Sequence, residues 1–431
     1  MTPLVNPFIN SGVVPVELII VDSIKASRIF SPLIYEGGSL GLYGERGMGK
    51  SSLLNYIAHP PVDWQNDHLK NHIFVSFNCP DTVSPFTPSN FWLHAVKHLD
   101  SKMKAGPIKE KCQKLLKLQE EGVDLGSNNF HEILDVAAGA GMRIVLVLDD
   151  FDAFIIDDKD HIEITRTFLQ GLRSLTTRNS NKANLVTATR RHLEELCKSV
   201  NVLGVSPFSN GFTLYRVQMF RDLEMARLFQ WVEKIGQPCF NSNEASYISY
   251  LSGHHPQLAQ IAASEIFNQR LEMGAPLNDL TPVGELFKSE SRHVFESLWD
   301  AASEIEQMML MLIALQKLEG KIPKRQYDLT DLSVIFSQRE RELIELFNRG
   351  LIIKTRTDPP EWDIFSPVFG WWVLKEIESV DPEQLSERRK VWGNLLTQKQ
   401  ANRLEQLANA VRDNIGVIEA FGKTVILLLP H

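Results

Sequence analysis

The sequence lacks the features that mark disulfide-rich, membrane-spanning and secreted proteins. Its 431 residues include only four cysteines, and no two of them form a C-x-x-C pair, which argues against a disulfide framework and a cysteine-bound zinc ion. Charged residues interrupt every apolar run before it reaches the roughly 20 residues of a transmembrane helix. The N-terminus has no positively charged segment followed by an apolar one, as a signal peptide would. We therefore expect a cytoplasmic protein without a membrane partner.

The sequence also lacks an excess of positive charge. Lysine and arginine number 45 against 53 acidic residues, so the net charge is −8 and the chain as a whole does not attract nucleic acid or anionic lipid. Any such binding requires a local basic patch. The hydrophobic fraction of 43% is that of an ordinary globular protein, and the length is enough for about three domains.

What the sequence does contain is a glycine-rich phosphate-binding motif. The segment Gly44-Glu45-Arg46-Gly47-Met48-Gly49-Lys50-Ser51 matches the pattern G-x-x-x-x-G-K-[ST]. A strand-like segment (39–43) precedes it, and apolar residues at helical spacing (52–57) follow it, whereas an ordinary glycine-rich turn is the alternative. The glycines let several backbone N–H groups point at an anion, at a helix start where the dipole favours negative charge. We predict that ATP is bound by Gly44, Gly47, Gly49, Lys50, Ser51 and Ser52, and that the Ser51 hydroxyl is a ligand of Mg²⁺.

A run of apolar residues closed by carboxylates predicts the second half of this site. Residues 144–148 read as a buried strand, and Asp149, Asp150 and Asp152 follow at its C-terminal end, where parallel sheets place ligands. Asp149 is expected to hold Mg²⁺, directly or through water, and Asp150 to act as the base that orients an attacking water. Asp152 is interpreted as a cap of the next segment. The alternative is a buried strand that ends in a solvated acidic turn.

A third strand-like segment, 184–189, ends in polar and basic residues. Thr189 or Arg190 would contact the γ-phosphate from the edge of the sheet, so Arg190 joins Lys50 and Asp150 as a catalytic candidate. Equally, Arg190 and its neighbour Arg191 are surface charges at a helix entry. The segment Asn181-Lys182-Ala183-Asn184 lacks the aspartate of the guanine-reading N-K-x-D motif and precedes its strand, which disfavours GTP.

Strand-like and helix-like segments alternate from about residue 35 to 217, which predicts an α/β fold with a parallel sheet. The expected strands are 39–43, 72–77, 143–148, 184–189 and 212–217; the expected helices are 91–103, 109–121 and 162–175, with a loop at 122–127. From about residue 220 helices dominate, at 222–234, 244–251 and 256–273, followed by a linker at 274–282. Helices at 303–318, 329–336 and 338–348 precede two β-rich runs, 351–355 and 361–365, which is the order of a winged helix. A long polar helix at 382–412 and an apolar stretch at 424–430 close the chain.

With these pieces in place, residues 6–375 resemble STAND-type P-loop NTPases, especially bacterial members in which an AAA+-like ATPase core precedes a helical lid and a winged helix. The phosphate loop resembles the family's Walker A motif, and Asp149-Asp150-Phe151-Asp152 its Walker B motif. Two further segments add specificity: Leu251-Ser252-Gly253-His254-His255-Pro256 resembles the lid's G-G-H-P segment, and Phe365-Ser366-Pro367 resembles the exit of the winged-helix hairpin. The resemblance implies that Pro256 packs near the adenine.

With a tail that lies outside the resemblance, the chain is expected to have an organisation in four parts. These are a P-loop ATPase core at 1–218, a helical lid at 219–282, a winged-helix domain at 283–378 and a helical tail at 379–431. The chain departs from the family at two places: Ile19-Ile20-Val21-Asp22 stands where an F-V-G-R element is usual, and His254 stands at the second glycine of the lid motif. A site that binds ATP and hydrolyses it slowly is consistent with both departures.

The resemblance implies an ATP-dependent regulatory switch that works in bacterial signalling or antiviral defence with a sensor or effector protein, or as a homo-oligomer. The competing interpretation is a DNA-binding AAA+-type ATPase, an initiator or loader that uses its winged helix. The candidate recognition helix at 337–349 carries three arginines against three glutamates, unlike a phosphate-binding face, so nucleic acid ranks second. A scaffold with a structural nucleotide is a third interpretation. The tail helix either packs on the chain's own body or binds a partner.

Overall fold

The computed structural model describes residues 5–34, 38–82, 87–155, 161–178, 182–198, 200, 207–322, 327, 329, 332–355, 357–358, 360–379 and 382–427. The chain divides into two compact units. We call Val13–Glu45 with Gly49–Val217 the sheet unit, and Met1–Gly12, Arg46–Met48 and Gln218–His431 the helical unit. The expected residues Asn181 and 428–430 lie outside the described ranges, and the four-part organisation stays a prediction.

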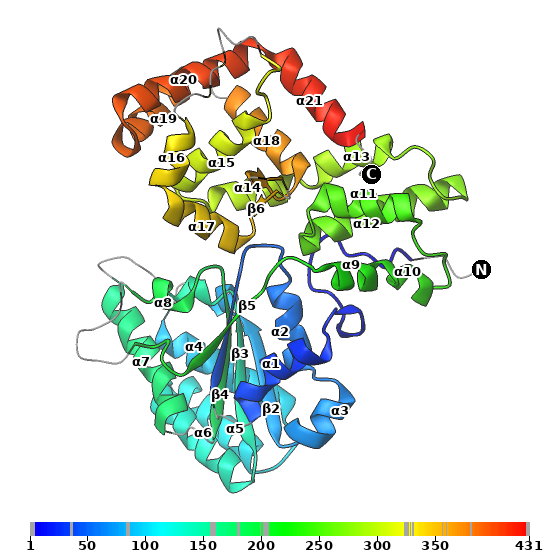
Figure 1. Ribbon diagram of the computed structural model, residues 1–431. Coiled ribbons are helices and arrows are strands. Elements are labelled where there is room, and N and C mark those ends of the chain that lie inside the picture. The colour runs from blue at the N-terminus through cyan, green and yellow to red at the C-terminus, as the bar shows by residue number, and fades with distance from the viewer. Residues whose placement is uncertain are drawn as a thin grey trace. The chain divides into compact units, whose positions relative to one another are not determined.

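The sheet unit is built on a five-stranded parallel sheet (Figure 1). Its strands, in the spatial order β2-β3-β4-β1-β5, are β2 (His72–Asn78), β3 (Arg143–Asp149), β4 (Ala183–Thr189), β1 (Ser39–Tyr43) and β5 (Phe212–Arg216). Every neighbouring pair is parallel, so all strands end at the same edge. The predicted α/β fold is therefore confirmed, and the ends of β1, β4 and β3 lie in that order at the edge where the phosphate loop leaves β1.

Helices cover both faces of this sheet, which explains why its strands are apolar on both sides. One face packs Val75, Leu146 and Leu185 against Phe91 and Phe130 of the helices α4 and α6. The other face meets α1 and α2, whose apolar residues are also buried. The helices of the unit are α1 (Ser23–Ile34), α2 (Lys50–Ala58), α3 (Val62–Trp64), α4 (Pro88–Lys102), α5 (Pro107–Glu120), α6 (Ser127–Gly139), α7 (Ile162–Arg178) and α8 (Leu193–Leu196).

The helical unit begins with a group of helices to which the first residues of the chain also belong. Phe8 stacks on Trp231 and Phe240, with ring centroids 5.9 and 5.7 Å apart, and the backbone N–H of Ile9 donates to Gln260 Oε1 at 2.8 Å. These contacts explain why the first residues belong to the helical unit. The group comprises α9 (Asp222–Phe229), α10 (Trp231–Lys234), α11 (Ser242–Ser252), α12 (Pro256–Met273), α13 (Thr281–Glu290) and α14 (Arg292–Asp300).

A second group in the helical unit contains three helices followed by a hairpin. The hairpin pairs Ile352 with Ile364 and Lys354 with Trp362 in antiparallel register. This succession matches the predicted order of elements, while the winged-helix assignment itself stays a prediction. The elements are α15 (Glu304–Gln316), α16 (Leu332–Gln338), α17 (Glu340–Arg349), β6 (Ile352–Lys354), β7 (Trp362–Ile364) and α18 (Pro367–Glu378).

The expected elements are wrong in several places, each for a local reason. The loop at 122–127 is shorter, because Ser127 begins α6, and the linker at 274–282 ends where Thr281 begins α13. The helix expected at 222–234 divides at Gln230. The tail helix expected at 382–412 is two helices, α19 (Pro382–Leu395) and α20 (Gln398–Asp413). Thr397 separates them because its hydroxyl caps α20 and accepts from the backbone N–H of Gln400.

The apolar stretch expected at 424–430 is helical as far as it is described. Helix α21 (Ile415–Leu427) packs on α18, and its Ile426 carbonyl accepts a 2.9 Å hydrogen bond from the Tyr247 hydroxyl of α11. Within the described part of the tail, Leu404, Leu407 and Val411 of α20 are buried. The tail therefore packs on its own unit. Among the helices of the described ranges, none combines the length and hydropathy that crossing a bilayer requires.

Candidate functional site

The phosphate loop follows β1 and ends where α2 begins. Gly44 and Gly49 have φ values of 157° and 88°, and a side chain on Gly44 would place Cβ 2.6 Å from the Val217 carbonyl oxygen. Gly49 is the N-cap of α2 in the left-handed region, where glycine has no steric penalty. The third predicted glycine, Gly47, has φ 78° and belongs to the helical unit with Arg46 and Met48. The glycines thus stand where the backbone conformation requires them.

Lys50 lies in the first turn of α2 and is only 8% exposed. Its Nζ donates to the carbonyl oxygens of Gly44 and Glu45 at 2.8 and 3.0 Å, so the side chain folds back over the loop. Burial lowers the pKa of Lys50, and the nearby carboxylates of Asp152, Glu45, Asp150 and Asp149 oppose that shift. A cation held among loop carbonyls and acids is in a suitable place to meet phosphate oxygens.

The two predicted magnesium ligands influence each other within the sheet unit. Burial raises the pKa of Asp149 at the end of β3, and the Ser51 hydroxyl at the start of α2 opposes that shift. A hydroxyl beside a carboxylate is an oxygen donor set that suits Mg²⁺. Ser52, predicted to bind the nucleotide, is engaged elsewhere, because its Oγ accepts a 3.1 Å bond from the Val14 backbone N–H. Among the described residues, no group of three or more His, Cys, Asp or Glu side chains forms a metal site of its own.

Asp150, the predicted base, has a strained backbone. Its φ is 48°, in the left-handed region, and its N–H donates to Asp149 Oδ1 at 2.9 Å. Its side chain is exposed. A non-glycine residue in this region costs of order 1–3 kcal/mol, and such strain clusters at functional sites. The conformation turns the chain sharply after β3, and the base role stays a prediction.

Asp152 is the residue that the sequence interpretation underrated. Its carboxylate accepts the Arg190 backbone N–H at 2.9 and 3.3 Å, which ties the end of β3 to the end of β4. Burial raises the pKa of Asp152, and its negative charge is the strongest of those that counteract the lowered pKa of Lys50. Its carboxylate therefore joins two strand ends, and its charge favours the protonated form of Lys50. The sequence interpretation assigned the metal and base roles to Asp149 and Asp150, although the same motif also contains Asp152.

Strand β4 brings Thr189 and Arg190 to the edge of the sheet where β1 and β3 also end. Thr189 is 2% exposed, and its hydroxyl donates to the Arg191 carbonyl at 2.7 Å, so it serves the turn. The Thr189 carbonyl accepts the Gly44 N–H at 3.2 Å, which joins the loop to β4. The Arg190 side chain is exposed. Of the two interpretations of Arg190, surface charge and phosphate contact, neither is decided by these contacts.

In the helical unit, Pro256 is the first residue of α12 and is buried. His255 caps that helix, since its Nδ1 accepts the Leu258 N–H at 3.4 Å, and its other ring nitrogen bonds the Arg46 carbonyl at 3.1 Å. The adenine contact expected of Pro256 stays a prediction.

A phosphate loop follows the first strand of a parallel sheet, a serine follows the loop lysine, and an aspartate lies at the end of another strand. This combination defines a P-loop NTPase. Residues 29–187 match the AAA ATPase domain, and residues 142–317 match the family described as Novel STAND NTPase 2. These two matches support a P-loop NTPase of the STAND class. A protein of this class is expected to bind a nucleotide. No curated protein matches the chain.

Solved structures agree on the fold. The chain is similar to the Walker-type ATPase PABY2304 of Pyrococcus abyssi, with a TM-score of 0.51 and 16% identity over 82% of this chain and 96% of that one. It is also similar to the Aeropyrum pernix ORC2 protein in its ADPNP-ADP complexes, with a TM-score of 0.50 and 12% identity over 92% and 96% of the two chains. At such identities the likeness concerns the fold alone.

Proposed function

We propose that this protein is an ATP-dependent regulatory switch with slow ATPase activity. ATP binds at the phosphate loop through Gly44, Gly47 and Gly49, and the charge of Lys50 meets its phosphates. Ser51 and Asp149 would hold Mg²⁺, which neutralises phosphate charge when bound. The observation that carries the proposal is the buried Lys50, which donates to two loop carbonyls and is followed directly by Ser51, whose hydroxyl acts on the Asp149 carboxylate.

The switch needs ATP and ADP to stabilise different conformations. Inverting a two-state equilibrium from 1:99 to 99:1 takes about 5.5 kcal/mol of differential binding. The γ-phosphate with its metal is the charged group that differs between the two nucleotides. In this proposal Pro256 lies on the adenine side, and the nucleotide state exposes or hides a surface that binds a sensor or effector protein, or further copies of the chain, in bacterial signalling or antiviral defence.

Two substitutions test binding and hydrolysis separately. Lys50→Ala should abolish nucleotide retention through purification, whereas Asp150→Asn should retain nucleotide and turn over ATP more slowly, by roughly 100-fold or more. Lys182→Ala is the matched control, because Lys182 lies just before β4 and its side chain pairs with the exposed Asp135 of α6. Extraction of bound nucleotide and a phosphate-release assay measure the two effects. Retention by Lys50→Ala equal to that of the control would refute the site.

DNA binding is the second candidate, favoured by the succession of three helices and a hairpin. The exposed side of α17 opposes it, because Ile344 and Phe347 are 47% and 46% exposed there beside Glu345. Phosphate-contacting faces present Lys and Arg instead. The basic residues that the sequence offers for a patch are Lys321, Lys324, Arg325, Lys354 and Arg356. Of these, Lys324, Arg325 and Arg356 lie outside the described ranges, while Lys321 lies over the Phe421 ring at 4.4 Å and Lys354 over the Trp362 ring at 4.9 Å. Duplex binding with a steep salt dependence would reverse this ranking.

A further inference from the structure

The turn between α11 and α12 contains a residue in an unusual conformation. Of the described non-glycine residues, two have positive φ: Asp150, at the candidate site, and His254, with φ 66°. Asn and Gly adopt this region more readily than His, so His254 is held there at a cost. A side chain that persists under such strain needs contacts that compensate for it.

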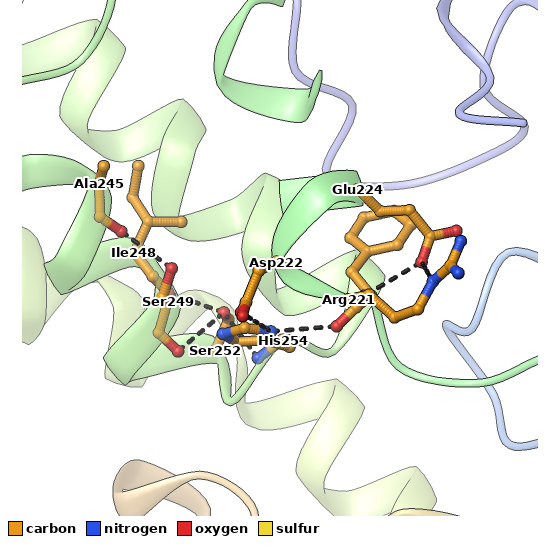
Figure 2. Close-up of polar contacts among 9 residues, drawn as sticks. Arg221, Asp222, Glu224, Ala245, Ile248, Ser249, Ser252 and His254 are labelled. Atoms are coloured by element: carbon orange, nitrogen blue, oxygen red, sulfur yellow. Dashed lines mark hydrogen bonds and ion pairs between the residues drawn. The ribbon is translucent and has the colours of Figure 1, made fainter. Parts of the chain in front are cut away.

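The compensating contacts join the turn to the segment that precedes α9. The His254 carbonyl accepts the Phe220 N–H at 2.9 Å, and His254 Nδ1 bonds the Phe220 carbonyl at 3.0 Å. Because a carbonyl can only accept, Nδ1 carries the proton in this bond. The Asp222 carboxylate lies 3.8 Å from the same nitrogen, and Ser252 Oγ accepts the His254 N–H at 3.2 Å (Figure 2). The backbone of His254 thus binds the N–H of Phe220, and its ring binds the carbonyl of the same residue.

The same turn also holds the tip of the phosphate loop, within the helical unit. The Gln257 N–H donates to the Gly47 carbonyl at 3.2 Å, next to the bond between His255 and the Arg46 carbonyl. A side chain at Gly47 would place Cβ 2.5 Å from Gln257 Oε1. One short turn, residues 252–257, is therefore bonded to the loop tip at one end and to Phe220 at the other.

We propose that His254 is a positioning residue for the nucleotide site: its ring fixes residues 218–221 to the turn that holds the loop tip, so that nucleotide binding and the conformation of 218–221 are coupled. This inference rests on the proposed function, since it assumes a nucleotide at the loop. The second glycine of the family's lid motif would keep the backbone bond at low strain and lack the ring bond. The His254 ring bond therefore provides the coupling between nucleotide binding and residues 218–221.

Three substitutions separate the ring from the backbone. His254→Gly removes the ring and relieves the strain, and His254→Ala removes the ring and keeps the strain. His254→Asn keeps an N–H donor near the position of Nδ1 and tolerates the left-handed region. Gly274→His is the matched control, because Gly274 has φ 67° at the other end of α12 and no atom lies within 4 Å of the position that a Cβ would take there. It introduces the same strain away from the turn.

The readouts are amide hydrogen exchange at Phe220 in nucleotide-free protein and the dissociation rate of a fluorescent ATP analogue. We expect His254→Gly and His254→Ala to speed both by about fivefold, as the loss of one neutral hydrogen bond implies, and His254→Asn and Gly274→His to stay near wild type. Exchange in His254→Gly equal to or slower than wild type would overturn the role of the ring. Faster exchange with unchanged dissociation would overturn the coupling. Wild-type protein that binds no analogue would instead refute the proposed function.

Discussion

At the scale of single residues, the candidate site is a set of buried charges that depend on one another. Lys50 loses hydration on burial, which lowers its pKa, and the carboxylates around it partly restore the charged form. Asp149 and Asp152 are themselves desolvated, and the pKa of each is raised. A site arranged in this way is less stable than it would be with neutral residues, as expected where function sets the choice of side chain.

Asp152 provides a test of that statement. Asp152→Asn keeps an oxygen that accepts the Arg190 N–H and removes a carboxylate whose raised pKa marks its charged form as disfavoured. We expect the nucleotide-free variant to gain about 0.5–2 kcal/mol in free energy of unfolding at pH 7, measured by urea denaturation. Asp152→Ala leaves the Arg190 N–H without that acceptor and should lose about 1–3 kcal/mol. Equal losses in both variants would contradict this account.

His72, at the start of β2, predicts a pH dependence. Burial, with the positive charge of Arg143, lowers the pKa of His72 to about 4 from its ordinary 6.5. Since the unfolded chain takes up this proton first, the native state loses stability as pH falls from about 6.5 to 4. Partial exposure reduces the effect to about 1–2 kcal/mol. We expect His72→Leu to lose less stability than wild type between pH 7 and pH 4.5 in urea titrations; parallel pH profiles would contradict the assignment.

At the scale of elements, close packing of α21 on α18 depends on a glycine. A Cβ on Gly422 would lie 2.4 Å from Trp371 Nε1, so a side chain there would displace the Trp371 ring. Gly416 lies in the same helix with nothing within 4 Å of its Cβ position. The two glycines thus differ in tertiary surroundings while sharing one secondary structure.

This difference predicts opposite effects of the same substitution. Gly422→Ala should lower the free energy of unfolding by about 1–3 kcal/mol through overpacking, whereas Gly416→Ala should raise it by about 0.5–1 kcal/mol through helix propensity. Thermal and urea denaturation of each variant measure the two changes in free energy of unfolding. If the two variants shift stability in the same direction, α21 does not pack on α18 as described.

At the scale of the whole molecule, nucleotide binding should stabilise the fold. A ligand present at 100 times its Kd adds about 2.7 kcal/mol to the native state, and for a chain of this size each kcal/mol corresponds to roughly 2–4 °C or less in Tm. We expect ATP with Mg²⁺ to raise the Tm of wild type by several degrees in scanning fluorimetry. The Lys50→Ala variant should show no such rise, and an equal rise in that variant would place the nucleotide elsewhere.

The sequence predicted local patterns better than their ends. All five strands of the sheet were expected within one or two residues, since each is an apolar run bounded by polar residues. Among the helices not expected from the sequence are α1, α6, α13, α14 and α18. Next to α1 and α6, residues 19–22 and 122–127 were interpreted by motif and by glycine content. In the tail, Thr397 was not recognised as a cap inside a polar stretch. Each of these depends on a single side chain or turn, which periodicity does not register.

The phosphate motif, the acidic strand end and the parallel α/β class followed from the sequence by itself, because glycine conformation and strand burial are local requirements that leave local patterns. Only the tertiary structure decided that Asp152 accepts from the Arg190 N–H, that Ser52 accepts from the Val14 N–H and that His254 bonds Phe220. These pairings join segments far apart in the chain. They depend on which strand ends and turns come together when the units fold, and no spacing in the sequence encodes that.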